Sequence, residues 1–473
     1  MKRKNILLVM ADQFRADWMS CAGTDYVETP NIDRIAKRGV IFSKASCNSP
    51  LCAPSRASLA SGLYPERVGV MDNDANYPLE APTYYQLLRK NGYRVGVVGK
   101  TDLHKPIHQY GLNGNTPLMY HLGFTDPIDT EGKMNAAFIF EGADYESISA
   151  EKEREAVFFT PVGPYQKYLL ERNKFQVFKM DYITRMTEKP IWYSGKSVLS
   201  KEDYHDWFIA KKSCDFIKNM DENSPWHLFV SFVGPHDPWD APEKYLEKFK
   251  DKEYPDSIED SSNEDKPEWI KRRINKHSKG IGEKDIQGVK QNYSGMISLI
   301  DDGIGKILDC LEEQNQLDNT IIIFTADHGE MMGDHGLFQK SVMYESALRV
   351  PFIVADPSSE RQGIIDDVSM IELIDIAPTI MEMSSIDYIE KQFDGKSFVS
   401  LLSGEKRMHK RYQVSQLHNT HMIFDGRYKF IENKNDRNEL YDLKEDKIEK
   451  NNLIDSHASI ARELFQKLKD IAS

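Results

Sequence analysis

The residues best suited to chemistry lie in one short stretch, where Cys52 precedes Pro54 and Arg56. Small residues predict a helix over about Ser55–Ser61, and Pro54 suits its first turn because the N–H that proline lacks has no helical acceptor there. The free N–H groups and positive dipole end of that helix would then lie beside Cys52 and attract an anion. Arg56 would add a fixed cation. A structural thiol ahead of an ordinary helix is the alternative, because a reactive cysteine needs such a special environment.

Two other pairs of side chains have the chemistry of metal ligands. Asp12 and Gln13 follow one short apolar run, and Asp327 and His328 follow another. Hard divalent cations prefer oxygen ligands, above all carboxylates, whereas imidazole suits manganese or zinc better than calcium. An isolated aspartate could equally be a turn residue. A metal site is therefore predicted only if the fold brings the two pairs together.

Four further cationic or titratable side chains stand after apolar runs or in a glycine-containing loop: Lys100, His104, His236 and Lys340. A single lysine or histidine is most often a surface or packing residue. Grouped around Cys52, however, they would neutralise an anionic substrate and move protons.

The elements that must position these residues alternate along the chain. Apolar, β-rich runs typical of buried strands occur at Ile6–Met10, Tyr93–Val98, Trp226–Val233 and Ile321–Phe324. Helical patterns occur at Asn31–Arg38, Pro82–Asn91, Trp207–Met220 and Gln291–Gln314. This alternation predicts an α/β fold with a large doubly wound mixed sheet flanked by helices. Ligands bind at the carboxyl ends of the strands in such sheets, so the polar residues that follow the strands should share one site.

Two domains are predicted. The first is a catalytic α/β domain over 1–385, with insertions at about 105–200 and 250–285. The second is a smaller C-terminal α+β subdomain over 386–473. Its antiparallel strands are expected at Arg411–Ser415, His421–Phe424, Tyr428–Glu432 and Glu439–Leu443, followed by a closing amphipathic helix over Ala458–Ala472.

Composition excludes several classes of protein. The net charge of −13 on 473 residues argues against a nucleic-acid partner, which would require a basic face. Five cysteines without metal-type spacing do not form a disulfide framework. The apolar run near the N-terminus is too short for a signal peptide, and no stretch is long enough to span a membrane. These features predict a cytoplasmic protein without a membrane partner, and they leave its oligomeric state open.

The string from Asn48 to Gly62, with Cys52-Ala53-Pro54-Ser55-Arg56 at its centre, resembles the type I sulfatases of the alkaline phosphatase superfamily. Glu439-Leu440-Tyr441-Asp442-Leu443 resembles a feature of the C-terminal subdomain of that family. The resemblance implies an alkaline-phosphatase-like fold. It also implies that a formylglycine-generating enzyme or an anaerobic sulfatase-maturating enzyme oxidises Cys52 to formylglycine (3-oxoalanine).

The resemblance further implies a set of metal ligands: Asp12, Gln13, Asp327, His328 and the modified Cys52. The family metal is calcium. Many sulfatases have Asp and Asn where this chain has Gln13 and His328, so either His328 binds a softer metal such as manganese or it faces an oxyanion bound to the metal. Phosphonate monoester hydrolases and choline sulfatases also have a glutamine and a histidine at the positions that match Gln13 and His328.

The implied catalytic residues are Cys52, Arg56, Lys100, His104, His236 and Lys340. Lys100 and Lys340 would bind the sulfate, and His236 would protonate the leaving alcohol. The family histidine usually comes two positions after the lysine. Here that position is Asp102, so the role passes to His104 or to Asp102.

The resemblance therefore predicts a sulfatase that hydrolyses a sulfate monoester of a sugar or another small molecule such as choline. The main alternative is a phosphonate or phosphate ester hydrolase of the same superfamily. A binding protein that keeps an unmodified Cys52 is the second alternative.

Overall fold

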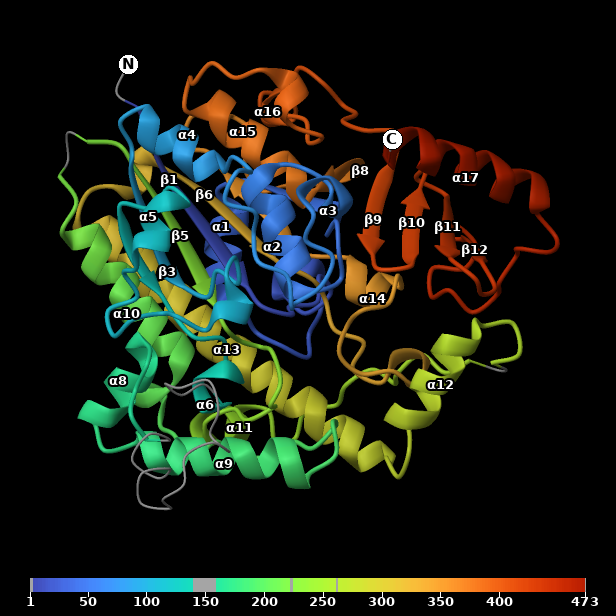
Figure 1. Ribbon diagram of the computed structural model, residues 1–473, viewed down its shortest axis with the longest axis horizontal. Coiled ribbons are helices and arrows are strands. Elements are labelled where there is room, and N and C mark those ends of the chain that lie inside the picture. The colour runs from blue at the N-terminus through green and yellow to red at the C-terminus, as the bar shows by residue number, and fades with distance from the viewer. Residues whose placement is uncertain (1–2, 139–158, 222–223, 261–262, 473) are drawn as a thin grey trace.

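The computed structural model describes residues 3–138, 159–221, 224–260 and 263–472. A large sheet of eight strands has helices on both faces, and a smaller sheet of four strands lies beside it (Figure 1). This arrangement confirms the predicted α/β fold with a smaller C-terminal antiparallel sheet.

The large sheet has the strand order β4-β3-β5-β1-β6-β7-β2-β8. Its strands are β1 (Asn5–Ala11), β2 (Val40–Ser46), β3 (Arg94–Gly99), β4 (Asp126–Asp129), β5 (Trp226–Phe232), β6 (Thr320–Ala326), β7 (Phe352–Ala355) and β8 (Ile364–Glu372). β7 runs antiparallel to both of its neighbours, and the other pairings are parallel. The central strands β1, β5 and β6 are buried along their whole length, as their continuous apolar runs predict.

The helices of four residues or more are α1 (Pro30–Lys37), α2 (Cys52–Ser61), α3 (Pro65–Val68), α4 (Tyr84–Lys90), α5 (Pro117–His121), α6 (Asn135–Phe138), α8 (Pro164–Glu171), α9 (Phe175–Glu188), α10 (His205–Lys218), α11 (Glu243–Lys248), α12 (Glu268–His277), α13 (Glu283–Glu313), α14 (Glu345–Leu348), α15 (Ile376–Met383), α16 (Val399–Leu402) and α17 (Ala458–Ala472). α10 packs against α13 and the sheet, whereas α2, α4 and α15 pack together. The side chains of β5 alternate between these layers, since Trp226 meets Phe216 of α10 and Phe229 stacks on Tyr85 of α4.

Two helices begin earlier than the sequence pattern indicates. α2 begins at Cys52 after an extended Leu51, so the cysteine is the first helical residue, and Pro54 is tolerated within the first turn. α13 begins at Glu283 rather than near residue 291, and the Asp285 carboxylate accepts the N–H of Gly282 at its N-terminus.

The small sheet has the order β12-β11-β10-β9 and is antiparallel throughout. Its strands are β9 (Gln413–Leu417), β10 (Thr420–Phe424), β11 (Tyr428–Asn433) and β12 (Glu439–Asp442), each within a few residues of its predicted bounds. α17 covers β10 and β11, and its bounds are the predicted ones. The division of the chain at residue 385 stays a prediction, as do the two insertions, of which the first includes positions outside the described residues.

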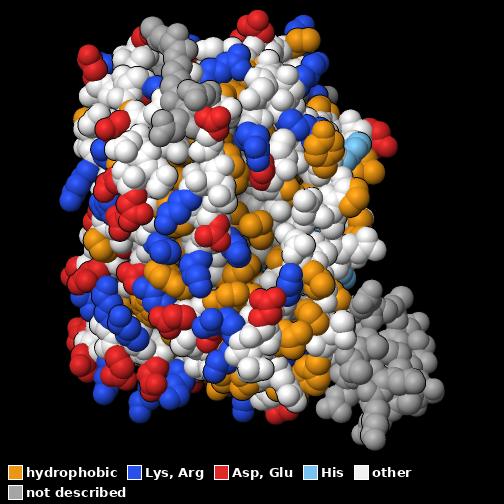
Figure 2. Space-filling model, turned by 90° about the vertical axis from the view of Figure 1, so that its left-hand side faces the viewer, with side chains coloured by type: hydrophobic (Ala, Val, Ile, Leu, Met, Phe, Trp, Pro, Cys, Tyr) orange, Lys and Arg blue, Asp and Glu red, His pale blue; other side chains and the backbone are white. Residues whose placement is uncertain are grey.

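The surface is mixed in charge. On the face shown in Figure 2, acidic and basic side chains are interspersed among apolar ones. Within the described part of the chain, no helix is long and apolar enough to cross a membrane.

Candidate active site

Four neighbouring strands deliver polar residues to one edge of the large sheet. Asp12 follows β1, Lys100 follows β3, His236 lies four residues beyond β5, and Asp327 follows β6. Gly99 makes the exit from β3 possible, because its φ of 112° is left-handed and a Cβ there would lie 1.9 Å from the Ser231 carbonyl oxygen. The strand ends therefore meet as predicted from the alternation of strands and helices.

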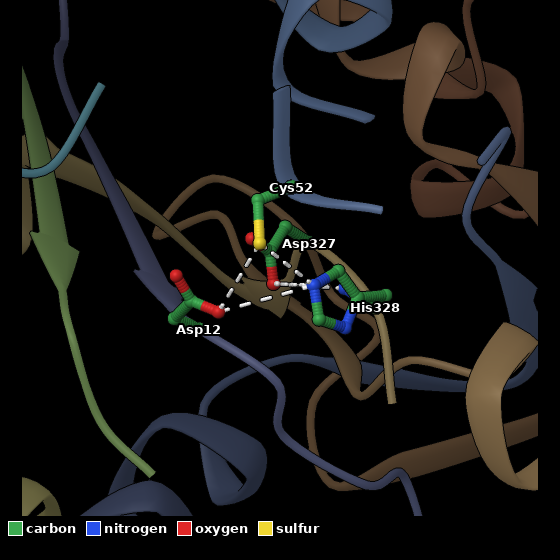
Figure 3. Close-up of side chains that lie close together, drawn as sticks. All are labelled: Asp12, Cys52, Asp327 and His328. Carbon is green, nitrogen blue, oxygen red and sulfur yellow. Dashed lines mark hydrogen bonds and ion pairs between the residues drawn. The ribbon is translucent and has the colours of Figure 1, made fainter. Parts of the chain in front are cut away.

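Asp12, Cys52, Asp327 and His328 converge at this edge (Figure 3). One ligand atom from each lies within 4.8 Å of all the others, and all four residues are buried. The Cys52 Sγ lies 3.2 Å from His328 Nε2 and 3.9 Å from Asp12 Oδ1. The N-terminus of α2 thus places the thiol among two carboxylates and an imidazole.

This donor set fits a divalent metal. His328 Nδ1 lies 2.9 Å from the Gly329 carbonyl oxygen, so an N–H on Nδ1 donates to that carbonyl and the Nε2 lone pair faces the cluster. Carboxylate oxygens of Asp12 and Asp327 lie 3.9 and 3.7 Å from the same Nε2 atom. Two carboxylates and an imidazole whose Oδ1 and Nε2 atoms converge are suited to a metal ion.

The other predicted metal ligand, Gln13, makes different contacts. Its side-chain oxygen accepts a hydrogen bond from Lys340, and its Nε2 donates to Asp237 Oδ1 at 3.2 Å and to Glu330. Its backbone N–H donates to Asp327 Oδ1 at 2.9 Å. In this structure Gln13 therefore links Lys340 to the metal-binding cluster, and its role as a ligand stays a prediction.

Arg56 and Lys100 hold the far side of the two carboxylates. Arg56 lies 2.9 Å from Asp327 Oδ2 and 3.2 Å from Asp12 Oδ2. Lys100 forms an ion pair with Asp12, and its carbonyl accepts from Arg56 Nη1 at 2.6 Å. These two cations orient the aspartates so that the Oδ1 atoms face Cys52 and His328.

The surrounding charges change the acidity of the thiol. Burial and the Asp12 carboxylate raise the pKa of Cys52, but Lys100, Lys340 and His328 outweigh them and bring that pKa well below its usual value. The cluster therefore stabilises an anionic group at the position of the Cys52 Sγ.

Lys340 and His236 contact each other beside the cluster. Lys340 Nζ lies 2.5 Å from His236 Nε2, while His236 Nδ1 lies 2.6 Å from the Asp237 carbonyl oxygen. Burial lowers the pKa of Lys340, but Cys52, Asp237 and Asp12 outweigh it and raise that pKa above its usual value. The Lys340 ammonium therefore faces His236 Nε2 within hydrogen-bond distance.

His104 makes its side-chain hydrogen bond outside this cluster. Its Nε2 is 2.7 Å from Asp129 Oδ2, and its Nδ1 is buried without a partner among the described residues. Asp102 lies 3.1 Å from Lys100 and has a left-handed φ of 55°. No contact joins His104 to Cys52 in the described structure, so its action on the nucleophile stays a prediction.

A small pocket opens beside Lys100 and His236. It is lined by Lys100, Lys105, Gly132, Lys133, Met134, Asn135 and His236. Lys133 is buried and donates to the carbonyl oxygens of His236 at 3.0 Å and of Pro238 at 2.6 Å. Lys133 also forms an ion pair with Asp240 at 2.7 Å, and Lys100 and Lys105 each lie 3.1 Å from Asp102 Oδ2. Acidic partners therefore already balance part of the positive charge around this pocket.

The sequence did not single out Lys133, Glu330 and Arg273. Glu330 follows Asp-His-Gly and could have been noticed there, but Lys133 and Arg273 lie in the two insertions without a recognisable motif. Arg273 of α12 donates to the Lys340 carbonyl and, at 3.3 Å, to the Ser341 carbonyl. The second insertion therefore supports the backbone of a site residue.

Comparison with known proteins agrees with this geometry. The family model described as Sulfatase matches residues 4–386, and the model described as N-sulphoglucosamine sulphohydrolase, C-terminal, matches 333–473. An arylsulfatase of Clostridium perfringens is 30% identical, with 96% of this chain and 91% of the relative covered. A choline-sulfatase of Rhizobium meliloti is 27% identical, with 96% and 83% covered.

Two solved structures have the same fold at lower identity. A phosphonate monoester hydrolase of Agrobacterium radiobacter gives a TM-score of 0.78 at 23% identity, covering 99% of this chain and 95% of that one. A protein in complex with its substrate D-glucosamine-2-N,6-O-disulfate gives 0.74 at 23% identity, covering 99% and 97%. The match of the Sulfatase model over most of the chain, together with the arylsulfatase relative, shows that the chain belongs to the sulfatase family.

Proposed function

We propose that this sulfuric ester hydrolase cleaves a sulfate monoester at the cluster formed by Asp12, Cys52, Asp327 and His328. One observation supports this site above all: the first residue of α2 is a cysteine whose Sγ lies among metal-type ligands while three buried cations surround it. A sulfate ester needs its oxygens neutralised before sulfur can be attacked, and these cations serve that purpose.

Membership of the family implies formylglycine and a divalent metal. Formylglycine supplies a hydroxyl nucleophile that can later release sulfate, and the metal lowers the cost of the charge that develops on oxygen. We propose Cys52 as the residue that is converted, and Asp12, Gln13, Asp327 and His328 as the residues that hold the metal. Ca²⁺ is our first candidate, and Mn²⁺ is the second because His328 offers an imidazole.

The protein's own side chains then have separate tasks. Lys100 and Arg56 orient Asp12 and Asp327, and Lys100 also lines the pocket where the sulfate would enter. His236, whose Nε2 contacts the Lys340 ammonium, is the group that we assign to protonate the leaving oxygen.

We infer that His104 accepts a proton during release of the product. Its Nδ1 and Asp102 Oδ1 are buried without hydrogen-bond partners among the described residues, and both belong to the turn after Lys100. Burial lowers the pKa of His104, but Asp129 and Asp102 outweigh it and raise that pKa above its usual value.

Conversion of Cys52 requires a maturating enzyme as partner, of either the formylglycine-generating or the anaerobic type. Cys52 is 1% exposed and every residue of α2 is buried. A modifying enzyme must therefore reach this segment before α2 packs against the sheet. The cytoplasmic location stays a prediction from the sequence.

We propose a sulfated sugar as the substrate. The bacterial relatives include an N-acetylglucosamine-6-O-sulfatase, 24% identical, with 99% of this chain and 86% of the relative covered. The solved structure with D-glucosamine-2-N,6-O-disulfate bound has the same fold.

The test compares turnover of 4-nitrophenyl sulfate with that of a 4-nitrophenyl phosphonate ester. We expect the sulfate to be preferred, and loss of its turnover after chelation with EDTA, followed by recovery with Ca²⁺ or Mn²⁺. Mass spectrometry of the peptide that contains Cys52 should show formylglycine. Preference for the phosphonate, or full activity after exhaustive chelation, would overturn the proposal.

A further inference from the structure

A buried lysine contacts the segment 236–240, here called the His236 loop. Lys133 lies in the turn between β4 and α6, and its side chain is 2% exposed. Its ammonium lies 3.0 Å from the His236 carbonyl oxygen, 2.6 Å from the Pro238 carbonyl oxygen and 2.7 Å from Asp240 Oδ1. An ammonium has three N–H donors, so these three oxygens of one short loop can take all of them.

Asp240, the acid of that contact, is fixed by three hydroxyl groups. Its Oδ1 also accepts the Tyr204 hydroxyl at 2.7 Å, and its Oδ2 accepts those of Tyr182 at 2.9 Å and Ser197 at 3.2 Å. Tyr182 belongs to α9, and Tyr204 directly precedes α10. The ion pair with Lys133 therefore lies within a buried network that holds the His236 loop against two helices.

The His236 loop sets the direction in which the imidazole points. His236 Nδ1 lies 2.6 Å from the Asp237 carbonyl oxygen, and His236 Nε2 faces the Lys340 ammonium. The two carbonyls that accept from Lys133 belong to residues 236 and 238, on either side of the carbonyl that contacts Nδ1. Lys133 thus holds the backbone that orients the ring.

Lys133 lines the same pocket as Lys100, which would also suit a lysine that binds sulfate. Its N–H donors, however, already have oxygen acceptors in the His236 loop. The Met296 sulfur lies 3.0 Å from the ammonium, and the centre of the Tyr204 ring lies 5.5 Å from it. A sulfate oxygen could take an N–H from Lys133 only if a bond to the His236 loop were broken.

We propose that Lys133 is a positioning residue for His236, which holds the His236 loop so that Nε2 reaches the leaving oxygen, and that Lys133 does not bind the sulfate. This inference rests on the proposed function, in which His236 protonates that oxygen. The loss of activity on removal of Lys133 should therefore grow with the need of the leaving group for a proton.

The experiment measures kcat and KM of Lys133→Met on phenyl sulfate and on 4-nitrophenyl sulfate. Phenol resembles the tyrosine side chain, whose pKa is about 10, whereas the more acidic 4-nitrophenol leaves readily without a proton. Because a misplacement of about 1 Å can cost about 10²-fold, we expect that loss of kcat on phenyl sulfate, a loss below about tenfold on 4-nitrophenyl sulfate, and KM values within about twofold of the parent.

Lys179→Met is the matched control, because Lys179 is a buried lysine of the same insertion that does not line the pocket. Its kcat should stay parental on both esters. Equal losses of kcat on the two esters in Lys133→Met, or a rise in KM at parental kcat, would show that Lys133 acts on the sulfate group and would overturn the inference.

A double-mutant cycle connects the effect to His236. In a His236→Ala background, Lys133→Met should lower kcat on phenyl sulfate by less than about twofold further, because the ring that it orients is gone. A further loss as large as in the parent background would mean that Lys133 acts through another group.

Lys133→Met leaves the buried Asp240 carboxylate without its cation, which can impair folding. The double variant Lys133→Met/Asp240→Asn removes both charges and should show the same dependence on the leaving group. Its crystal structure should show His236 Nε2 displaced by about 1 Å or more from its place beside Lys340. An unchanged His236 loop would refute the inference, whether or not the parent is active, whereas a parent that hydrolyses no sulfate ester would contradict the proposed function.

Discussion

Two buried charge networks in this molecule look alike but serve different ends. The catalytic cluster pairs Arg56 and Lys100 with Asp12 and Asp327 at the sheet edge. The second network, here called the junction network, consists of Lys429 with Glu345 and Glu449. It lies where the small sheet meets the catalytic part of the chain, because Lys429 belongs to β11 and Glu345 to α14.

The two networks differ in whether atoms remain that could bind a metal or react with a substrate. In the junction network the fully buried Lys429 ammonium lies 2.7 Å from one carboxylate and 2.5 Å from the other, and a Glu449 oxygen also accepts the Glu345 N–H. In the catalytic cluster a thiol and an imidazole join the charges, and their ligand atoms converge. Burial of charge therefore does not identify a site by itself. Convergence of nucleophile and ligand atoms does.

The largest effect should come from the nucleophile. Cys52→Ala should reduce sulfatase turnover by more than about 10³-fold, because alanine has no group that can be oxidised to formylglycine. Cys52→Ser should leave at most a trace where the serine stays unmodified, because a serine nucleophile forms an ester that needs a second hydrolysis. The thermal midpoint should change little, since the cluster is held by Arg56 and Lys100. Initial rates on 4-nitrophenyl sulfate provide the measurement, and a serine variant that mass spectrometry shows to be unmodified, yet is as active as the parent, would refute the formylglycine nucleophile.

Next comes Lys340→Met, which removes the ammonium beside His236 while keeping the length of the side chain. We expect a loss of about 10²–10³-fold in kcat, as for other groups that stabilise charge in a transition state. Stability should stay near that of the parent or rise, because residues placed for function are often not optimal for folding. A variant with parental kcat would remove Lys340 from the site.

The same substitution in the junction network should have the opposite outcome. Lys429→Met leaves Glu449 without its cation and leaves Glu345 with Arg349 alone, at 3.8 Å, and we expect a loss of about 3 kcal/mol in the free energy of unfolding. Urea denaturation measures this loss, while kcat per folded molecule should stay close to parental. If the variant keeps its stability but loses turnover, the junction network serves catalysis rather than folding, and the proposed difference between the two networks is wrong.

The smallest effect is expected at Asn48, whose side chain bonds both the end of the large sheet and the small sheet. Its side chain donates to Glu372 at 2.9 Å and to the Val414 carbonyl at 3.1 Å, and it accepts the Ile374 N–H at 3.1 Å. Asn48→Ala should cost about 2 kcal/mol in unfolding free energy, because these buried partners lose their bonds. We expect only a several-fold fall in kcat.

The exposed Asn275→Ala provides the control for this measurement. Loss of turnover in Asn48→Ala as large as that of Lys340→Met would mean that Asn48 acts on the chemistry directly.

The sequence patterns predicted which residues come together wherever those residues directly follow a strand. Asp12, Lys100, His236 and Asp327 follow continuous apolar runs, and parallel strands bring such ends together by geometry. The sulfatase-like string singled out Cys52, which the structure places beside Asp12, Asp327 and His328, and its role as nucleophile stays a prediction. The helices that were predicted lie within a few residues of their observed bounds, except for the start of α13, whereas helices such as α9, α12 and α15 were not predicted.

Other features lacked a local signal. β7 has four residues, and β8 mixes exposed and buried positions, so neither has a clear apolar period. The contact of Lys133 with the His236 carbonyl joins residues more than 100 positions apart, and so does the support that Asn48 receives from β9. Such pairings depend on tertiary packing, which a single sequence does not reveal.

The small sheet is bonded to the segment that leads into the nucleophile. The Gln416 N–H of β9 donates to the Asn48 carbonyl at 2.8 Å, and the side chain of Gln413 donates to the Lys44 carbonyl at the same distance. A protein shortened at residue 385 would lack these restraints on the approach to α2. The C-terminal part is therefore not an interchangeable module, and engineering of a minimal enzyme would have to keep it.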